Sequence, residues 1–168
     1  PEDRARLIPE LEHTDVRAIS SAACFPKVGS ETLMMFLTRW QASGVPLGSL
    51  LRQRGKHSIT VPRSAGHYVA AYELSLRRTQ QMVLQFSRIE DAELAFVLLN
   101  SNVFYWLWRV YGDAAHVTRA NIENCPVFPC RYDAYRGHAA ALREAAPDCI
   151  VYRRMRGKRV PYVDFNLR

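Results

Sequence analysis

The stretch that decides the fold is residues 81–111, QMVLQFSRIEDAELAFVLLNSNVFYWLWRVY. Its first six residues, Gln81–Phe86, are rich in apolar types that favour extended backbone, so they predict a strand. From about Ile89 to Tyr111 the apolar residues recur at core-like helical spacing. Asn100–Asn102 interrupts this pattern, because short polar side chains bond back to the backbone. The stretch therefore predicts a strand followed by two helices, or by one kinked helix.

Working outward toward the N-terminus, Ser30 is a plausible N-cap for a helix through about Ser43, and Gly44 stands where such a helix would end. A short helical turn is predicted over Leu47–Gln53. Residues 57–61 and 67–72 have strand-like composition and flank a Pro-Arg-Ser-Ala-Gly turn, so they predict a hairpin. Residues 1–29 are mixed in character and predict loop with a strand or two.

Toward the C-terminus, Thr118 is expected to cap a short helix through Asn124. A longer helix is expected over about 134–146, where Pro147 ends it. The remaining tail is rich in arginine and then apolar. Helices and strands in this mixed order predict one α+β domain over residues 1–168, with a small, mostly antiparallel sheet and a hairpin packed against several helices.

The charge of the chain favours an anionic partner. Among 168 residues, 23 are Lys or Arg and 16 are Asp or Glu, which gives a formal net charge of +7. Arg dominates this excess, and guanidinium groups grip phosphates and guanine edges in bidentate fashion. A nucleic acid is therefore the expected partner, although a membrane surface or an acidic protein would also attract such a chain.

The four cysteines, Cys24, Cys125, Cys130 and Cys149, form no CxxC pair. We expect reduced cytoplasmic thiols that pack as small hydrophobes, with no metal; a zinc site using Cys125, Cys130 and a histidine is the alternative. No apolar run reaches the roughly 20 residues of a membrane span. The chain opens on Pro1 within a charged stretch, as expected for a piece of a longer protein.

Five sequence blocks lie in a fixed order within residues 95–129. They are Leu99–Asn100–Ser101, Phe104–Tyr105–Trp106, Gly112–Asp113, His116–Val117–Thr118 and Asn121–Ile122–Glu123–Asn124–Cys125–Pro126. This order resembles the specificity domain that follows the catalytic domain in large adenine-N6 DNA methyltransferases and fused restriction–modification enzymes. Residues 54–57 and 63–68 resemble the hairpin that these domains place before the helix, so the resemblance covers roughly residues 30–130. Cys125 departs from the more usual Phe or Leu, and the Arg-rich tail has no counterpart.

The resemblance implies a DNA target-recognition domain, with catalysis in a separate domain of the parent chain. The catalytic Asn/Asp/Ser-Pro-Pro-Tyr/Phe loop of these enzymes is missing, since no two prolines are adjacent. S-adenosylmethionine is therefore expected to bind that other domain, where the target adenine is flipped from the duplex. The sequence also lacks a nuclease-type Glu/Asp-x-Lys pair, a P-loop, a nucleophile elbow and a His-Glu-x-x-His helix, so no catalysis is expected from this chain.

Candidate DNA-binding residues follow from charge, hydrogen-bonding capacity and position. They are Arg52, Arg54, Lys56, His57, Arg63 and His67 around the predicted hairpin, Arg119 and Asn121 on the short helix, and Arg153, Arg154, Arg156 and Lys158 in the tail. If the hairpin and the tail both touch one duplex, they should form a continuous basic face. A solvated surface is the alternative for each of these residues.

Other motif residues have structural interpretations. The helical spacing around Phe104 and Trp108 favours core packing over base stacking. Trp106 and Trp108 cannot share one helix face, and Trp108 is expected to be the buried one. His116 is expected to act as a turn residue and Thr118 as an N-cap. At the level of function, the alternatives are an RNA or single-strand binding module, an unfamiliar enzyme such as a nuclease, and a protein-interaction domain with an incidental basic surface.

Overall fold

Helices and short antiparallel strands follow one another in mixed order in the computed structural model, which describes residues 15, 17, 26–65, 68–73, 76, 80–128, 132–155 and 157–165. The helices are α2 (Glu31–Ser43), the 3-10 helix η2 (Leu47–Leu50), α3 (Ile89–Leu99), α4 (Asn102–Tyr111), α5 (Arg119–Glu123) and α6 (Asp133–Ala145). The strands are β1 (Val45–Pro46), β2 (His57–Pro62), β3 (Gln81–Phe86), β4 (Pro126–Val127), β5 (Ile150–Met155) and β6 (Lys158–Val163). They form three antiparallel pairs, β1–β4, β2–β3 and β5–β6, so the predicted α+β class is confirmed.

The predicted hairpin of residues 57–61 with 67–72 is wrong in its pairing. The full-length partner of β2 is β3, with His57 opposite Phe86 and Pro62 opposite Gln81. Of the described residues 68–72, Tyr72 alone bridges to β2, where it forms two backbone hydrogen bonds of 2.8 and 2.9 Å with Thr60 on the edge away from β3. The reason is periodicity: β3 alternates buried and more accessible residues and offers one apolar face, whereas residues 69–72 are buried in succession. His67 lies outside the described residues.

Helix α2 begins and ends where the sequence predicts. The Ser30 hydroxyl accepts a hydrogen bond from the Leu33 amide at 3.3 Å, and the Gly44 amide donates to the Trp40 carbonyl at 2.9 Å. The backbone of Gly44 is extended, so its conformation does not require glycine. A close approach does: a Cβ there would lie 2.7 Å from Cβ of Pro126, in the strand that pairs with β1.

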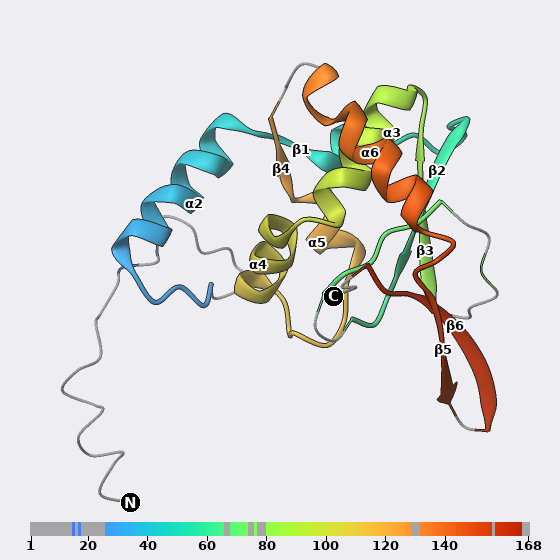
Figure 1. Ribbon diagram of the computed structural model, residues 1–168. Coiled ribbons are helices and arrows are strands. Elements are labelled where there is room, and N and C mark those ends of the chain that lie inside the picture. The colour runs from blue at the N-terminus through green and yellow to red at the C-terminus, as the bar shows by residue number, and fades with distance from the viewer. Residues whose placement is uncertain are drawn as a thin grey trace, which may run out of the picture.

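Two separate helices, α3 and α4, replace the single long helical pattern, and the break falls at Asn100 and Ser101. The Asn100 side chain accepts from the Ala71 amide at 3.0 Å and donates to the Ala71 and Phe96 carbonyls at 3.1 and 2.8 Å. The Ser101 hydroxyl caps α4 by accepting from the Phe104 amide at 3.2 Å. The main core is built from residues of these helices, of α2 and of the β2–β3 pair, and Figure 1 shows how these elements are arranged.

Helix α6 packs along α3 and is held there by a polar network around Glu93, a buried charged residue. Arg143 donates to Glu93 at 3.1 Å and to both carboxylate oxygens of Glu73 at 2.6 and 2.8 Å. The Tyr132 hydroxyl bonds to Glu93 at 2.5 Å. The carboxylate of Glu93 is thus paired and hydrogen-bonded, as a buried charge must be.

The Arg-rich tail forms the β5–β6 hairpin. Gly157 in its turn has a φ of +79°, a conformation that glycine adopts without strain. The base of the hairpin packs on a second, small core that contains Ala70, Tyr72, Cys149 and Val163. Figure 1 shows the rest of the hairpin projecting from the body of the molecule. In the part of the chain that the structure describes, no helix is long and apolar enough to cross a membrane.

Candidate nucleic-acid interface

The β5–β6 hairpin is the most basic of the elements that the structure describes. Residues 150–163 read IVYRRMRGKRVPYV, which holds four arginines and one lysine and no acidic residue. Arg153, Arg154, Lys158 and Arg159 are all exposed. Arg156 lies outside the described residues. Because the hairpin projects from the body, polar ligands can approach its side chains from more than one direction.

The strand register sorts the hairpin side chains onto two faces. Val151 lies opposite Tyr162, Arg153 opposite Val160 and Met155 opposite Lys158. The other face carries the pairs Ile150–Val163, Tyr152–Pro161 and Arg154–Arg159. We call them the Arg153 face and the Arg154 face, since side chains alternate along a strand and paired residues share a face. Each face therefore carries two described basic residues and a tyrosine.

Cation–π contacts fix the position of one arginine on each face. The guanidinium of Arg159 lies 4.3 Å from the ring centroid of Tyr152, and that of Arg153 lies 5.3 Å from the ring of Tyr162. Arg153 also approaches the Asp164 carboxylate at 3.7 Å. Such contacts restrict the flexible arginine chains and leave their outer N–H groups able to meet an anion. Within the described part of the chain, the Arg154 guanidinium has no hydrogen-bonding or ion-pair partner.

A second basic surface is a cleft of about 530 Å³ near the end of β2. We call it the Arg63 cleft; its lining residues are Arg63, Gln80, Gln81, Met82, His116, Val117, Thr118 and Arg119. It forms because residues 63–65 and 115–117 pair: the Val117 amide donates to the Arg63 carbonyl at 2.8 Å, and the Ala65 amide donates to the Ala115 carbonyl at 3.2 Å. The cleft thus brings Arg63 together with His116 and Arg119, which lie more than fifty residues after it in the sequence.

Several groups of the Arg63 cleft are engaged within the protein. Arg119 forms an ion pair with Glu123 at 2.7 Å. The His116 imidazole lies 2.7 Å from Asp113, and the backbone and ring of His116, followed by the Ala115 amide, hold the pKa of the Asp113 carboxyl far below its usual range. Arg63 has no ion pair among the described residues, so it is the arginine of this cleft most available to a ligand.

The side chain of Asn121 is partly engaged in capping α5. The side-chain oxygen of Asn121 accepts hydrogen bonds from the Thr118 backbone N–H at 2.9 Å and from the Thr118 hydroxyl at 2.7 Å. In return, the Thr118 hydroxyl oxygen accepts from the Asn121 backbone N–H. This reciprocal capping box confirms Thr118 as an N-cap. Only the amide nitrogen of Asn121 remains for an outside partner.

The loop before β2 lies apart from the other basic residues. The Arg52 guanidinium turns back to the Ser49 and Leu51 carbonyls at 2.8 and 2.6 Å, whereas Arg54 and Lys56 are exposed and His57 is half-buried. In Figure 1, β2 begins at the upper end of the molecule and the β5–β6 hairpin projects from the lower end. The expectation of one continuous basic face over residues 52–67 and 153–159 is therefore wrong for this loop. The length of β2 explains this separation, because the strand spans about 20 Å between Lys56 and Arg63.

The motif residues that carried the family resemblance serve the fold. The contacts of Asn100, Ser101, Asp113 and Thr118 are given above, and the other motif residues lie in or beside α5 and β4. Ile122 is fully buried, Glu123 pairs with Arg119, Asn124 ends α5 and Pro126 lies buried in β4. Their spacing is thus explained by caps and packing.

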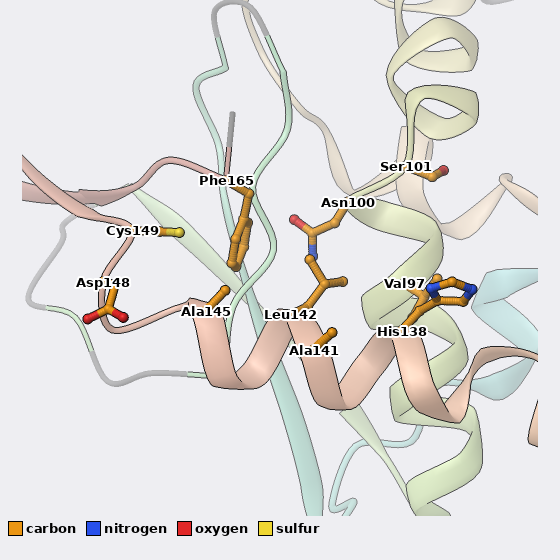
Figure 2. A pocket seen from close by; sticks show the side chains of 10 residues that line it. All are labelled: Val97, Asn100, Ser101, His138, Ala141, Leu142, Ala145, Asp148, Cys149 and Phe165. Carbon is orange, nitrogen blue, oxygen red and sulfur yellow. The ribbon is translucent and has the colours of Figure 1, made fainter. Parts of the chain in front are cut away.

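The pocket between α3 and α6 has mainly apolar walls, with His138 and Asp148 as its exposed titratable residues. It encloses about 580 Å³, and Figure 2 shows its lining residues arriving from α3, α6 and the segments around Cys149 and Phe165. The polar atoms of Asn100 and Ser101 at its wall already bond to the protein backbone. Burial raises the pKa of the Cys149 thiol, which does not favour a reactive thiolate.

The described cysteines pack as hydrophobes, as expected. Cys125 is fully buried, and burial raises the pKa of its thiol to about 12. Cys24 and Cys130 lie outside the described residues, so the alternative zinc site involving Cys130 is not defined by the structure. Among the residues that are described, no group of three His, Cys, Asp or Glu side chains is placed to hold a metal ion.

Sequence reasoning missed three side chains of the hairpin: Tyr152, Arg159 and Tyr162. The signal was present, since Gly157 follows one six-residue run and precedes another, residues 150–155 and 158–163, and both runs contain valine and tyrosine. Comparison with protein-family models, with curated proteins and with solved structures finds no match for this chain.

Proposed function

We propose that this chain is a sequence-specific double-stranded DNA recognition domain, and that it belongs to an adenine-N6 methyltransferase of a restriction–modification or phage-defence system. The β5–β6 hairpin is the observation that carries the DNA-binding part of this proposal. It is exposed, contains no acidic residue and presents arginines beside tyrosines. Phosphates supply most of the affinity of such surfaces, and arginine is also the side chain that reads guanine.

The Arg63 cleft supports specificity in addition to affinity. Its wall combines Arg63 with Gln80 and Gln81, and glutamine forms paired hydrogen bonds with adenine edges. The Gln81 side-chain oxygen already accepts from Tyr72 at 3.2 Å, so Gln80, which is exposed, is the better reader of the two. The link to adenine methylation rests on the order of the five sequence blocks alone. In this proposal catalysis and S-adenosylmethionine belong to a separate domain of a cytoplasmic parent chain.

Selection from a random duplex library tests the function. The purified chain is incubated with 30-base-pair duplexes that contain a randomised centre, at a salt concentration where excess heparin removes weak complexes. Enrichment of one motif is expected, together with loss of enrichment in the Arg63→Gln/Gln80→Ala variant. A library that stays random, with all binding abolished by heparin, would refute sequence-specific recognition.

A single-strand nucleic-acid binding module is the second candidate, and one side chain favours it. Tyr152 is 55% exposed and has Arg159 stacked over its ring, an arrangement on which an unpaired base can stack. Titration of a fluorescent 20-nucleotide strand and of its duplex separates the two functions. Tighter binding of the single strand, together with a loss of about 1–3 kcal/mol in Tyr152→Ala, would favour this second candidate.

A further inference from the structure

We infer that the β5–β6 hairpin enters the major groove of B-form DNA as a ribbon, with the Arg153 face and the Arg154 face turned toward opposite walls of the groove. This inference rests on the proposed function and adds a groove and an orientation to it. The observation behind this inference is that both faces of the hairpin carry basic residues. A hairpin that lies flat on a polyanion needs cations on one face only.

Charge is divided equally between the two faces. Arg153 and Lys158 lie on one face, and Arg154 and Arg159 lie on the other, as the register requires. All four residues are exposed. If the hairpin lay flat, two of these cations would point into solvent; phosphates on both sides neutralise all four.

Dimensions select the major groove. The two strands of a ribbon lie about 4.8 Å apart in the plane of the ribbon, and across its two faces a ribbon with its side chains is roughly 10 Å thick, the spacing at which sheets pack face to face. The major groove of B-form DNA is about 12 Å wide and the minor groove about 6 Å. The A-form major groove of duplex RNA is deep and too narrow for such side chains. Duplex DNA is therefore the nucleic acid that fits this ribbon.

The body of the domain leaves the ribbon accessible from both sides over its outer part. Among the described residues, the hydrogen bond and the core packing that hold the hairpin to the body lie at its base, where the Tyr68 hydroxyl donates to the Val163 carbonyl at 2.9 Å and Val163 joins the second core. The basic pairs lie nearer the turn at Gly157. Insertion therefore needs no rearrangement of the core.

Two matched double variants test the orientation. Arg153→Gln/Lys158→Gln neutralises the Arg153 face, and Arg154→Gln/Arg159→Gln neutralises the Arg154 face; Arg39→Gln/Arg109→Gln, on exposed helix positions, is the control. Affinity of each full chain for a 20-base-pair duplex is measured between 50 and 200 mM salt, with circular dichroism as the check on folding. Insertion predicts that both face variants lower the slope of log K against log salt by about 1.8, since each lost phosphate contact contributes about 0.9. The control should leave the slope unchanged.

Groove identity is tested on the same duplex. Prior binding of netropsin, which occupies the minor groove, should leave the affinity within a factor of two, and an RNA duplex of the same sequence should bind at least tenfold more weakly. A slope change in only one face variant, or competition by netropsin, would overturn the inference while leaving DNA binding intact. Failure of the unmodified chain to bind any duplex would instead overturn the proposed function, and the inference with it.

Discussion

Single residues show where this fold tolerates no change, and Gly55 is the clearest case. A Cβ at Gly55 would lie 2.3–2.5 Å from backbone atoms of Phe86, whereas a Cβ at Gly137, in α6, would meet nothing within 4 Å. Gly55→Ala should therefore lower the free energy of unfolding by about 1–3 kcal/mol, because backbone must shift. Gly137→Ala, the matched control, should raise it by about 0.5–1 kcal/mol through helix propensity. Urea denaturation measures both, and equal effects of the two changes would contradict the close packing at Gly55.

The two tryptophans of α4 also separate at this scale. Trp108 is 1% exposed and its indole N–H donates to the His116 carbonyl at 2.9 Å, while Trp106 is half-buried. Trp108→Ala should cost about 3–5 kcal/mol of unfolding free energy as a core truncation, and Trp106→Ala clearly less. Denaturation followed by circular dichroism compares them. A fully stable Trp108→Ala protein with reduced DNA affinity would support base stacking instead of core packing.

Burial makes a chemical prediction for Cys125. Its thiol pKa of about 12, against an ordinary 9.0, lowers the thiolate fraction at pH 8 by roughly a thousandfold. Iodoacetamide labelling, resolved by peptide mass spectrometry, should modify Cys125 slowly in the native protein and rapidly in 8 M urea. Rapid native labelling would mean that the core around α5 and β4 opens under native conditions.

At the scale of elements, Asn100 joins α3 to the segment beside β2. The Asn100 side-chain amide hydrogen-bonds to both the backbone N–H and the backbone carbonyl of Ala71, a fully buried residue. It thereby takes the place that a neighbouring strand would have. Asn100→Ala leaves both groups unpaired and should cost about 2–4 kcal/mol of stability. Asn102→Ala, an exposed position two residues away, should cost under about 1 kcal/mol. If Asn100→Ala instead lost DNA affinity at unchanged stability, this motif residue would have a recognition role.

For the whole molecule, the uneven packing predicts uneven stability. The main core joins α2, α3, α4 and the β2–β3 pair, whereas β5–β6 is held at its base by a small second core. Amide hydrogen exchange should therefore be slowest in β2, β3 and α3 and faster near the hairpin turn. Addition of duplex DNA should slow exchange in β5 and β6 more than in α2. Protection that appears first in α2 or α6 would place the nucleic-acid interface elsewhere.

Local sequence determined much of this protein. The caps at Ser30, Ser101 and Thr118 fixed where α2, α4 and α5 begin, because a hydroxyl that satisfies a helix amide acts within three residues. Helical spacing placed Trp108 in the core and predicted α6 within a residue or two of its bounds. Net charge, a property of composition, predicts an anionic partner, and this stays a prediction.

Tertiary structure decided what depends on pairing over distance. Whether β2 would pair with residues 67–72 or with β3 was settled by which segment could bury an alternating face, and short-range turn signals at residues 62–66 favoured the wrong one. The Arg63 cleft likewise exists only because residues 63–65 pair with 115–117. The strand register, finally, places basic residues of the tail on both faces of the β5–β6 hairpin, because alternation along the paired strands assigns each described arginine to one face.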